Sequence, residues 1–132
     1  MIQINKEDQQ SVLEALIKAY PLEACGIMAG IDGIVSRLYP VENILSSPHA
    51  YYMDPTQQLE AMLDFEERGL EMLAIYHSHP HGPEIPSKSD ITQATYPESA
   101  YVIISLVDRQ QPSIRAFTIV DGRVKEIPYR VI

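Results

Sequence analysis

Three side chains with metal-binding chemistry lie close together in the middle of the chain. His77 and His79 follow an apolar run, residues 70–76, that is typical of a buried strand, and Asp90 follows after a short loop. Extended backbone directs residues i and i+2 to the same side, so both imidazoles are expected to face one way. Two histidines and one carboxylate supply three protein ligands and leave a fourth tetrahedral position open to water. This pattern indicates a catalytic zinc site rather than a structural one.

Each part of this stretch also has an ordinary structural explanation. Two histidines near a strand end are often polar edge residues, and Ser87-x-x-Asp90 is the pattern of a capping box that starts a helix. We expect this capping box to form as well, because it would fix Asp90 and direct it toward the histidines. The complete string HSHPHGPEIPSKSD, residues 77–90, is much more specific than either part.

This string resembles the JAMM motif of the MPN+ (Mov34/MPN/PAD-1) zinc metalloproteases, in which H-S/T-H-P and P-S-x-x-D are separated by a short loop. The family also has a glutamate far upstream, in P-x-E-x-C-G before a strand. Residues 21–26, PLEACG, are similar to that pattern, and Glu23 is the matching glutamate. The chain therefore resembles a small prokaryotic-type member of this family.

The resemblance implies a role for each matching residue. His77, His79 and Asp90 would bind Zn²⁺, and Glu23 would hold the catalytic water and act as general base and acid. Ser87 would steady the oxyanion. On the residues alone, Glu23 is a surface charge at a helix–strand junction, and only the family pattern gives it a catalytic role.

Further polar and aromatic residues near the motif have open or structural assignments. Ser78 alternates away from the histidine face and is expected to be structural. His81 is a substrate contact or, as the default, a solvated loop residue, and His49 has no assignment. Cys25 is expected to behave as a small buried hydrophobe rather than a further ligand. Tyr51–Tyr52 either line a groove or pack in the core.

Composition limits the possible partners and compartment. With 132 residues, 45% hydrophobic and 21% charged, the chain has the size and balance of one globular domain, 1–132. Its net charge of −8 argues against nucleic acid and against anionic membranes. The polar start, the absence of a long apolar run and the single cysteine predict a cytoplasmic protein.

The order of periodic segments predicts the fold class. Helices interleaved with apolar central strands and terminal hairpins predict an α/β fold with a mixed sheet flanked by helices. The resemblance implies a curved, cytidine-deaminase-like JAB1/MPN sheet. The expected helices follow Asn5 and Asp54, the second with an apolar face of Leu59, Met62 and Leu63, and a third follows Ser87. The expected strands are 25–31, 34–39, 51–53, 70–76, 100–107, 114–120 and 123–127, with hairpins at Asp32-Gly33 and Asp121-Gly122 and a break at Pro40.

The resemblance also implies the reaction. Members of this family cut ubiquitin or ubiquitin-like proteins after a C-terminal Gly-Gly, and small prokaryotic members act on sulfur-carrier proteins of that fold. Two alternatives are a catalytically silent MPN scaffold and a general zinc peptidase acting on short peptides. The scaffold is disfavoured because the full set of motif residues is present. A zinc nucleoside deaminase is excluded, because its P-C-x-x-C motif needs two cysteines and the chain has one.

Overall fold

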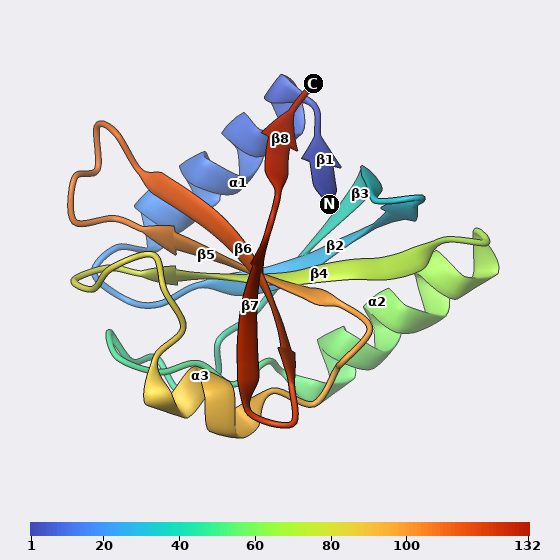
Figure 1. The fold of residues 1–132 in the computed structure, drawn as a ribbon. Coiled ribbons are helices and arrows are strands. Elements are labelled where there is room, and N and C mark those ends of the chain that lie inside the picture. Colours follow the sequence, from blue (N-terminus) through green and yellow to red (C-terminus); the bar gives the residue numbers. More distant parts are fainter.

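One eight-stranded sheet organises the chain, and helices lie against both of its faces. The computed structural model describes residues 1–132. The strands are β1 (Ile2–Ile4), β2 (Cys25–Ile31), β3 (Ile34–Val41), β4 (Glu71–His79), β5 (Ala100–Ser105), β6 (Ser113–Val120), β7 (Arg123–Ile127) and β8 (Tyr129–Val131). The helices are α1 (Lys6–Ala19), α2 (Pro55–Glu67) and α3 (Lys88–Gln93). The order β7-β6-β5-β4-β2-β3-β1-β8 places β4 centrally, between parallel β5 and antiparallel β2 (Figure 1). The predicted mixed sheet flanked by helices is confirmed.

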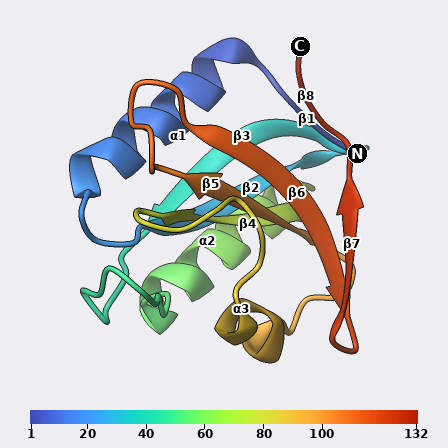
Figure 2. The same ribbon diagram turned by 60° about the vertical axis from the view of Figure 1, so that its left-hand side comes forward.

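The sheet curves until its two ends come together. β7 and β8 stand at opposite ends of the strand order, yet only Pro128 separates them in the sequence. Neighbouring strands are about 4.8 Å apart, so a flat sheet of this size would be roughly 34 Å wide, far beyond the reach of one residue. The strands therefore coil into a near-barrel, and Figure 1 and Figure 2 show β7 continuing directly into β8.

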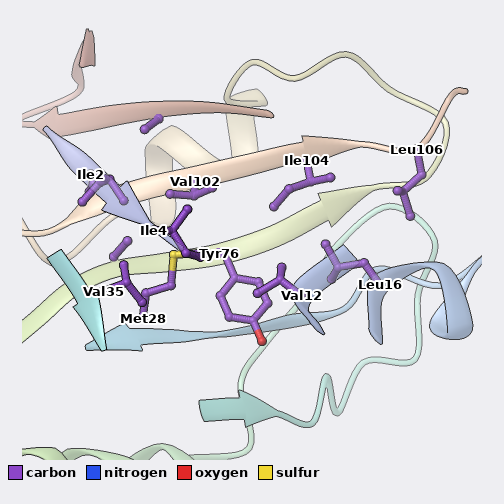
Figure 3. Close-up of a cluster of buried hydrophobic side chains, with 13 residues drawn as sticks. Ile2, Ile4, Val12, Leu16, Met28, Val35, Tyr76, Val102, Ile104 and Leu106 are labelled. Carbon is purple, nitrogen blue, oxygen red and sulfur yellow. The ribbon is translucent and has the colours of Figure 1, made fainter. Parts of the chain in front are cut away.

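Helix α1 covers one face of the sheet and encloses a core. Asn5 caps the helix as predicted, with its side chain accepting a backbone hydrogen bond from the first turn. Val12 and Leu16, from the apolar stripe of α1, are buried together with Met28 of β2 and Tyr76 of β4 (Figure 3). This core fixes the two strands that lead to the predicted metal site.

Helices α2 and α3 cover the opposite face (Figure 2), over a second core. In α2 the buried residues are Ala61 and Phe65, whereas Leu59 and Leu63 are 57% and 58% exposed. The predicted apolar face of Leu59, Met62 and Leu63 is therefore wrong, except that Met62 packs at the edge of this core. Ala61 and Phe65 are four residues apart and therefore lie on the same side of α2. Because Ala61 is small, this side of the helix can approach the sheet closely. None of the helices has the length and apolar character needed to cross a membrane.

The two predicted hairpins are confirmed. Asp32-Gly33 has φ values of 54° and 77°, and Asp121-Gly122 has 51° and 76°. Two positive φ angles in succession are the type I′ turn that Asp-Gly favours, and this turn matches the twist of paired strands. The strands β2 and β7 have the predicted limits, and β5 and β6 differ from prediction by one or two residues at one end.

Two predictions near Pro40 are wrong. β3 continues through Pro40, which pairs with Gly26 of β2. On its other side β3 pairs with β1 at Ile34 and not at Pro40, so the missing N–H of proline faces an open edge. Residues 51–53 do not form a strand, but are an extended segment joined to Asn43 by one antiparallel bridge at Met53.

Candidate metal centre

Strand β4 carries both motif histidines as its last residues. The strand was expected to end at Tyr76, but it extends to His79, so the rings project from regular backbone. Both residues are buried, with 0% exposure for His77 and 7% for His79. Their ring centroids lie 4.8 Å apart on the face covered by α2 and α3. A central strand buried on both sides thus holds the two imidazoles rigidly.

Helix α3 brings the carboxylate to the histidines. Its first turn is the predicted capping box: the Ser87 hydroxyl oxygen accepts from the Asp90 amide at 3.0 Å, and Asp90 Oδ2 accepts from the Ser87 amide at 2.9 Å. The same Oδ2 lies 3.2 Å from His77 Nε2 and 3.0 Å from His79 Nε2. The cap therefore does direct Asp90 toward the histidines, as expected.

The three ligand atoms have the spacing of one face of a tetrahedron. The two Nε2 atoms are 3.0 Å apart, which completes a triangle with Asp90 Oδ2. A zinc ion with bonds of about 2.0–2.2 Å separates its tetrahedral ligands by about 3.3–3.6 Å. His79 Nδ1 lies 2.7 Å from the Pro83 carbonyl, which can only accept, so the ring proton sits there and Nε2 offers a lone pair. The donor set fits a divalent cation.

His77 is oriented by packing instead of by a hydrogen bond. Its Nδ1 is buried without a hydrogen-bond partner. Tyr51 stacks on the ring, with centroids 4.4 Å apart and planes inclined by 29°. Complete burial lowers the pKa of His77 and favours the neutral imidazole, the form that binds metals. Tyr51 packs at the site and, together with Tyr52, also lines a cavity, so both possibilities that the sequence left open apply to it.

Glu23 reaches the histidines through the register of two strands. Ser78 donates through its amide to the Ala24 carbonyl at 3.0 Å, and its hydroxyl oxygen accepts from the Ala24 amide at 3.0 Å. Cys25 pairs with His77, so continuing the same antiparallel register places Ala24 opposite Ser78 and Glu23 opposite His79. The Glu23 and His79 side chains then lie on the same face. Ser78 is structural, as predicted, because it holds the segment that carries Glu23.

The environment of Glu23 gives its carboxyl an unusual proton affinity. The residue is 6% exposed. Burial raises the pKa of Glu23 to about 7; His79 opposes the shift and the charge of Asp90 adds to it. A carboxyl that titrates near neutral pH can both accept and release a proton during one reaction cycle.

A cavity joins these groups. It has a volume of about 340 Å³, and its lining includes Glu23, His79 and Ser87. The Ser87 hydroxyl oxygen accepts the capping hydrogen bond and keeps its own proton available as a donor. His49 and His81 line the same cavity. The structure thus brings all five predicted site residues together, and it adds His81, which the sequence left as a substrate contact or a solvated loop residue, and His49, which had no assignment.

Cys25 takes no part in the metal centre. Burial, followed by the charge of Glu23, raises the pKa of its thiol to about 12. Its Sγ donates to the Val41 carbonyl at 3.4 Å. A protonated, buried thiol is a poor metal ligand, so Cys25 is the small buried residue that the sequence predicts.

The near-barrel and this site define a known class of protein. The sequence model of the family described as prokaryotic homologues of the JAB domain matches residues 6–120, and the chain belongs to this family. It is 36% identical over 115 residues to the "CysO-cysteine peptidase" of Mycobacterium tuberculosis, covering 86% of this chain and 79% of that protein. It is 39% identical over 109 residues to the "Probable TtuB-protein conjugate cleaving protease" of Thermus thermophilus, covering 82% and 69%.

Solved structures show the same fold. A protein of Desulfitobacterium hafniense superposes with a TM-score of 0.90 at 36% identity, covering 100% of this chain and 93% of that one. A JAB1/MPN domain protein of Archaeoglobus fulgidus superposes with a TM-score of 0.66 at 18% identity, covering 99% of both chains. The predicted JAB1/MPN fold is confirmed, and with named peptidases among its relatives the chain is a hydrolase.

Proposed function

We propose that the chain is a zinc-dependent peptidase that hydrolyses the bond after the C-terminal Gly-Gly of a ubiquitin-like sulfur-carrier protein. The observation that carries this proposal is the position of Glu23. A carboxyl with a pKa of about 7 lies opposite His79 and lines one cavity with Ser87. Proton transfer, metal binding and oxyanion stabilisation can then act on one bound amide.

Each residue has a defined part in this reaction. His77, His79 and Asp90 would hold the ion, which when bound would supply an acidified water and polarisation of the substrate carbonyl. Glu23 takes a proton from the attacking water and delivers it to the amide nitrogen as the C–N bond breaks. The Ser87 hydroxyl donates a hydrogen bond to the carbonyl oxygen while negative charge develops there. The products are the carrier carboxylate and a free amine.

A second cavity, lined in part by the Tyr51 ring that stacks on His77, supports binding of an extended tail. It has a volume of about 480 Å³ and is rich in aromatic side chains, including Tyr51, Tyr52, Tyr96 and Tyr101. Tyr52 donates to the Asn43 side chain and accepts from Ile44 through its backbone. In an extended segment the backbone groups of successive residues point to opposite sides. The N–H and C=O groups of Tyr51 and Met53 therefore point away from Asn43, where they can pair with an added strand.

The names of the relatives support a protein conjugate as substrate. One relative is named for CysO-cysteine, another for TtuB-protein conjugates, and two others are named desampylases. We infer that the groove receives the tail of the carrier and that its glycines pass the metal closely, because glycine has no side chain to obstruct the approach.

The test is cleavage of carrier conjugates by the purified, zinc-loaded chain, with and without a chelator. We expect cleavage that the chelator abolishes and that zinc restores, and Gly-Gly→Ala-Ala in the carrier tail should block it. Equal turnover of an isolated tail peptide and the folded conjugate would instead favour a general peptidase. No hydrolysis of any conjugate would favour a silent scaffold.

A further inference from the structure

The cavity beside Glu23 contains a pair of histidines that the proposed reaction does not use. His49 comes from the loop before α2 and His81 from the loop after β4, and their ring centroids lie 6.5 Å apart. The backbone amide of His49 donates to the Ser47 hydroxyl, and the rings of His49 and His81 make no hydrogen bond within the chain. Every imidazole carries at least one N–H donor in either tautomer. Two donors from different loops therefore converge on one cavity.

Glu23 identifies this cavity as the leaving-group side of the site. In amide hydrolysis the proton carrier must reach the departing nitrogen, so the leaving group lies beside that residue. Glu23 lines the cavity of the two histidines and does not line the tyrosine-rich cavity. The two cavities thus separate the two halves of a conjugate, the carrier tail on one side and the released group on the other.

The charge around the histidine pair favours an anion. Glu23 is the only acidic residue that lines the cavity. His81 packs edge-on against Tyr20 at 5.4 Å, and the Arg109 guanidinium lies over that tyrosine ring at 4.2 Å. The Arg109 guanidinium and His81 thus contact the same tyrosine ring, which brings a fixed positive charge near this cavity in a chain whose net charge is −8.

We propose that His49 and His81 bind a carboxylate on the leaving group, so that the enzyme releases a free amino acid joined to the carrier through its α-nitrogen. This inference rests on the proposed function and narrows its substrate. The identities of 36% and 39% to a carrier–amino acid peptidase and to a protein-conjugate protease do not separate the two possibilities. The hydrogen-bond donors of the cavity do.

An α-linked amino acid and an isopeptide-linked lysine differ in the group that lies next to the scissile nitrogen. In an α-linked amino acid the carboxylate is one carbon away from the scissile nitrogen, within a cavity of about 340 Å³. In an isopeptide-linked lysine, a long aliphatic chain replaces the carboxylate next to the nitrogen. Its α-carboxyl is far away and bound in a further amide.

The test uses one carrier in three forms: ending in an α-linked cysteine with a free carboxylate, ending in cysteinamide, and linked to the side-chain nitrogen of a lysine peptide. We expect kcat/KM for the free acid to exceed that for the amide by about ten-fold or more, the effect of a hydrogen bond to a charged group. The isopeptide should be the poorest substrate. Equal rates for acid and amide, or a faster isopeptide, would overturn the inference.

Variants then test whether His49 and His81 are the residues that bind the carboxylate of the leaving group. The double variant His49→Ala, His81→Ala should bring the ratio of acid to amide rates close to one. Tyr52→Ala, in the tail cavity, should slow both conjugates alike and preserve that ratio. A double variant that keeps the full preference for the acid would also overturn the inference. Failure of the wild-type enzyme to cleave any of the three forms would contradict the proposed function itself.

Discussion

Ser78→Ala is expected to weaken both the fold and the reaction, through one hydrogen bond. Ser78 is fully buried, and its hydroxyl oxygen accepts from the half-buried Ala24 amide at 3.0 Å. The variant leaves that amide without its acceptor, and an unsatisfied buried donor costs about 1–3 kcal/mol. Because Ala24 is only half-buried, we expect about 1–2 kcal/mol. For a chain of this size that loss lowers Tm by roughly 3–10 °C, measured by thermal unfolding.

The same change should reduce turnover, because Glu23 immediately precedes Ala24. A displacement of about 1 Å in a reacting group costs on the order of 100-fold in rate. We therefore expect kcat on a carrier conjugate to fall by about 10–100-fold at a temperature where the variant is fully folded. Zinc content should stay unchanged, since the three proposed metal ligands keep their contacts.

Ser99→Ala is the matched control. Ser99 is also buried, and its hydroxyl donates to the Met72 carbonyl at 2.8 Å, close to the opposite end of β4. This variant should lose stability while keeping wild-type kcat. Wild-type turnover in folded Ser78→Ala, or equal losses of turnover in both variants, would refute the proposed link between Ser78 and Glu23.

Three other substitutions test the assigned roles. His79→Ala should lose stoichiometric zinc, measured by elemental analysis, whereas His49→Ala should retain it; equal zinc content in the two would exclude His79 as a ligand. Glu23→Gln should keep zinc and fold but lower kcat by about 100-fold or more, because it removes the proton carrier. A loss of zinc would make Glu23 a ligand. Ser87→Ala removes a helix cap, worth about 1 kcal/mol in thermal unfolding, and a donor to the oxyanion. A normal kcat with reduced stability would show that Ser87 acts only as the helix cap.

The sequence predicted the parts of this site that depend on local chemistry. The alternation of His77 and His79 follows from extended backbone, and the direction of Asp90 follows from a capping box closed within one helical turn. The Asp-Gly hairpins likewise depend on two residues with positive φ. In each case the determining contacts lie within a few residues, so the pattern alone is sufficient. The functional roles of these residues stay predictions.

Features that depend on distant contacts were not predictable in this way. The position of Glu23 opposite His79 depends on the pairing register of β2 and β4, and without the family resemblance no local signal indicates it. The Pro83 carbonyl that orients the His79 ring is a backbone group, so no residue type in the sequence indicates its role. The exposed face of α2 was misassigned because Leu59 and Leu63 have helical spacing but lie away from the sheet.

The closure of the sheet imposes an order on the synthesis of this protein. β1 pairs with β8, so residues 2–4 reach their partner only after residues 129–131 have left the ribosome. Contacts of such long sequence separation close large loops and form late, which slows folding. Until then β1 has a free edge that another chain can pair with. Removing residues 129–131 should therefore give a chain that aggregates during expression even though every residue of the metal centre is present.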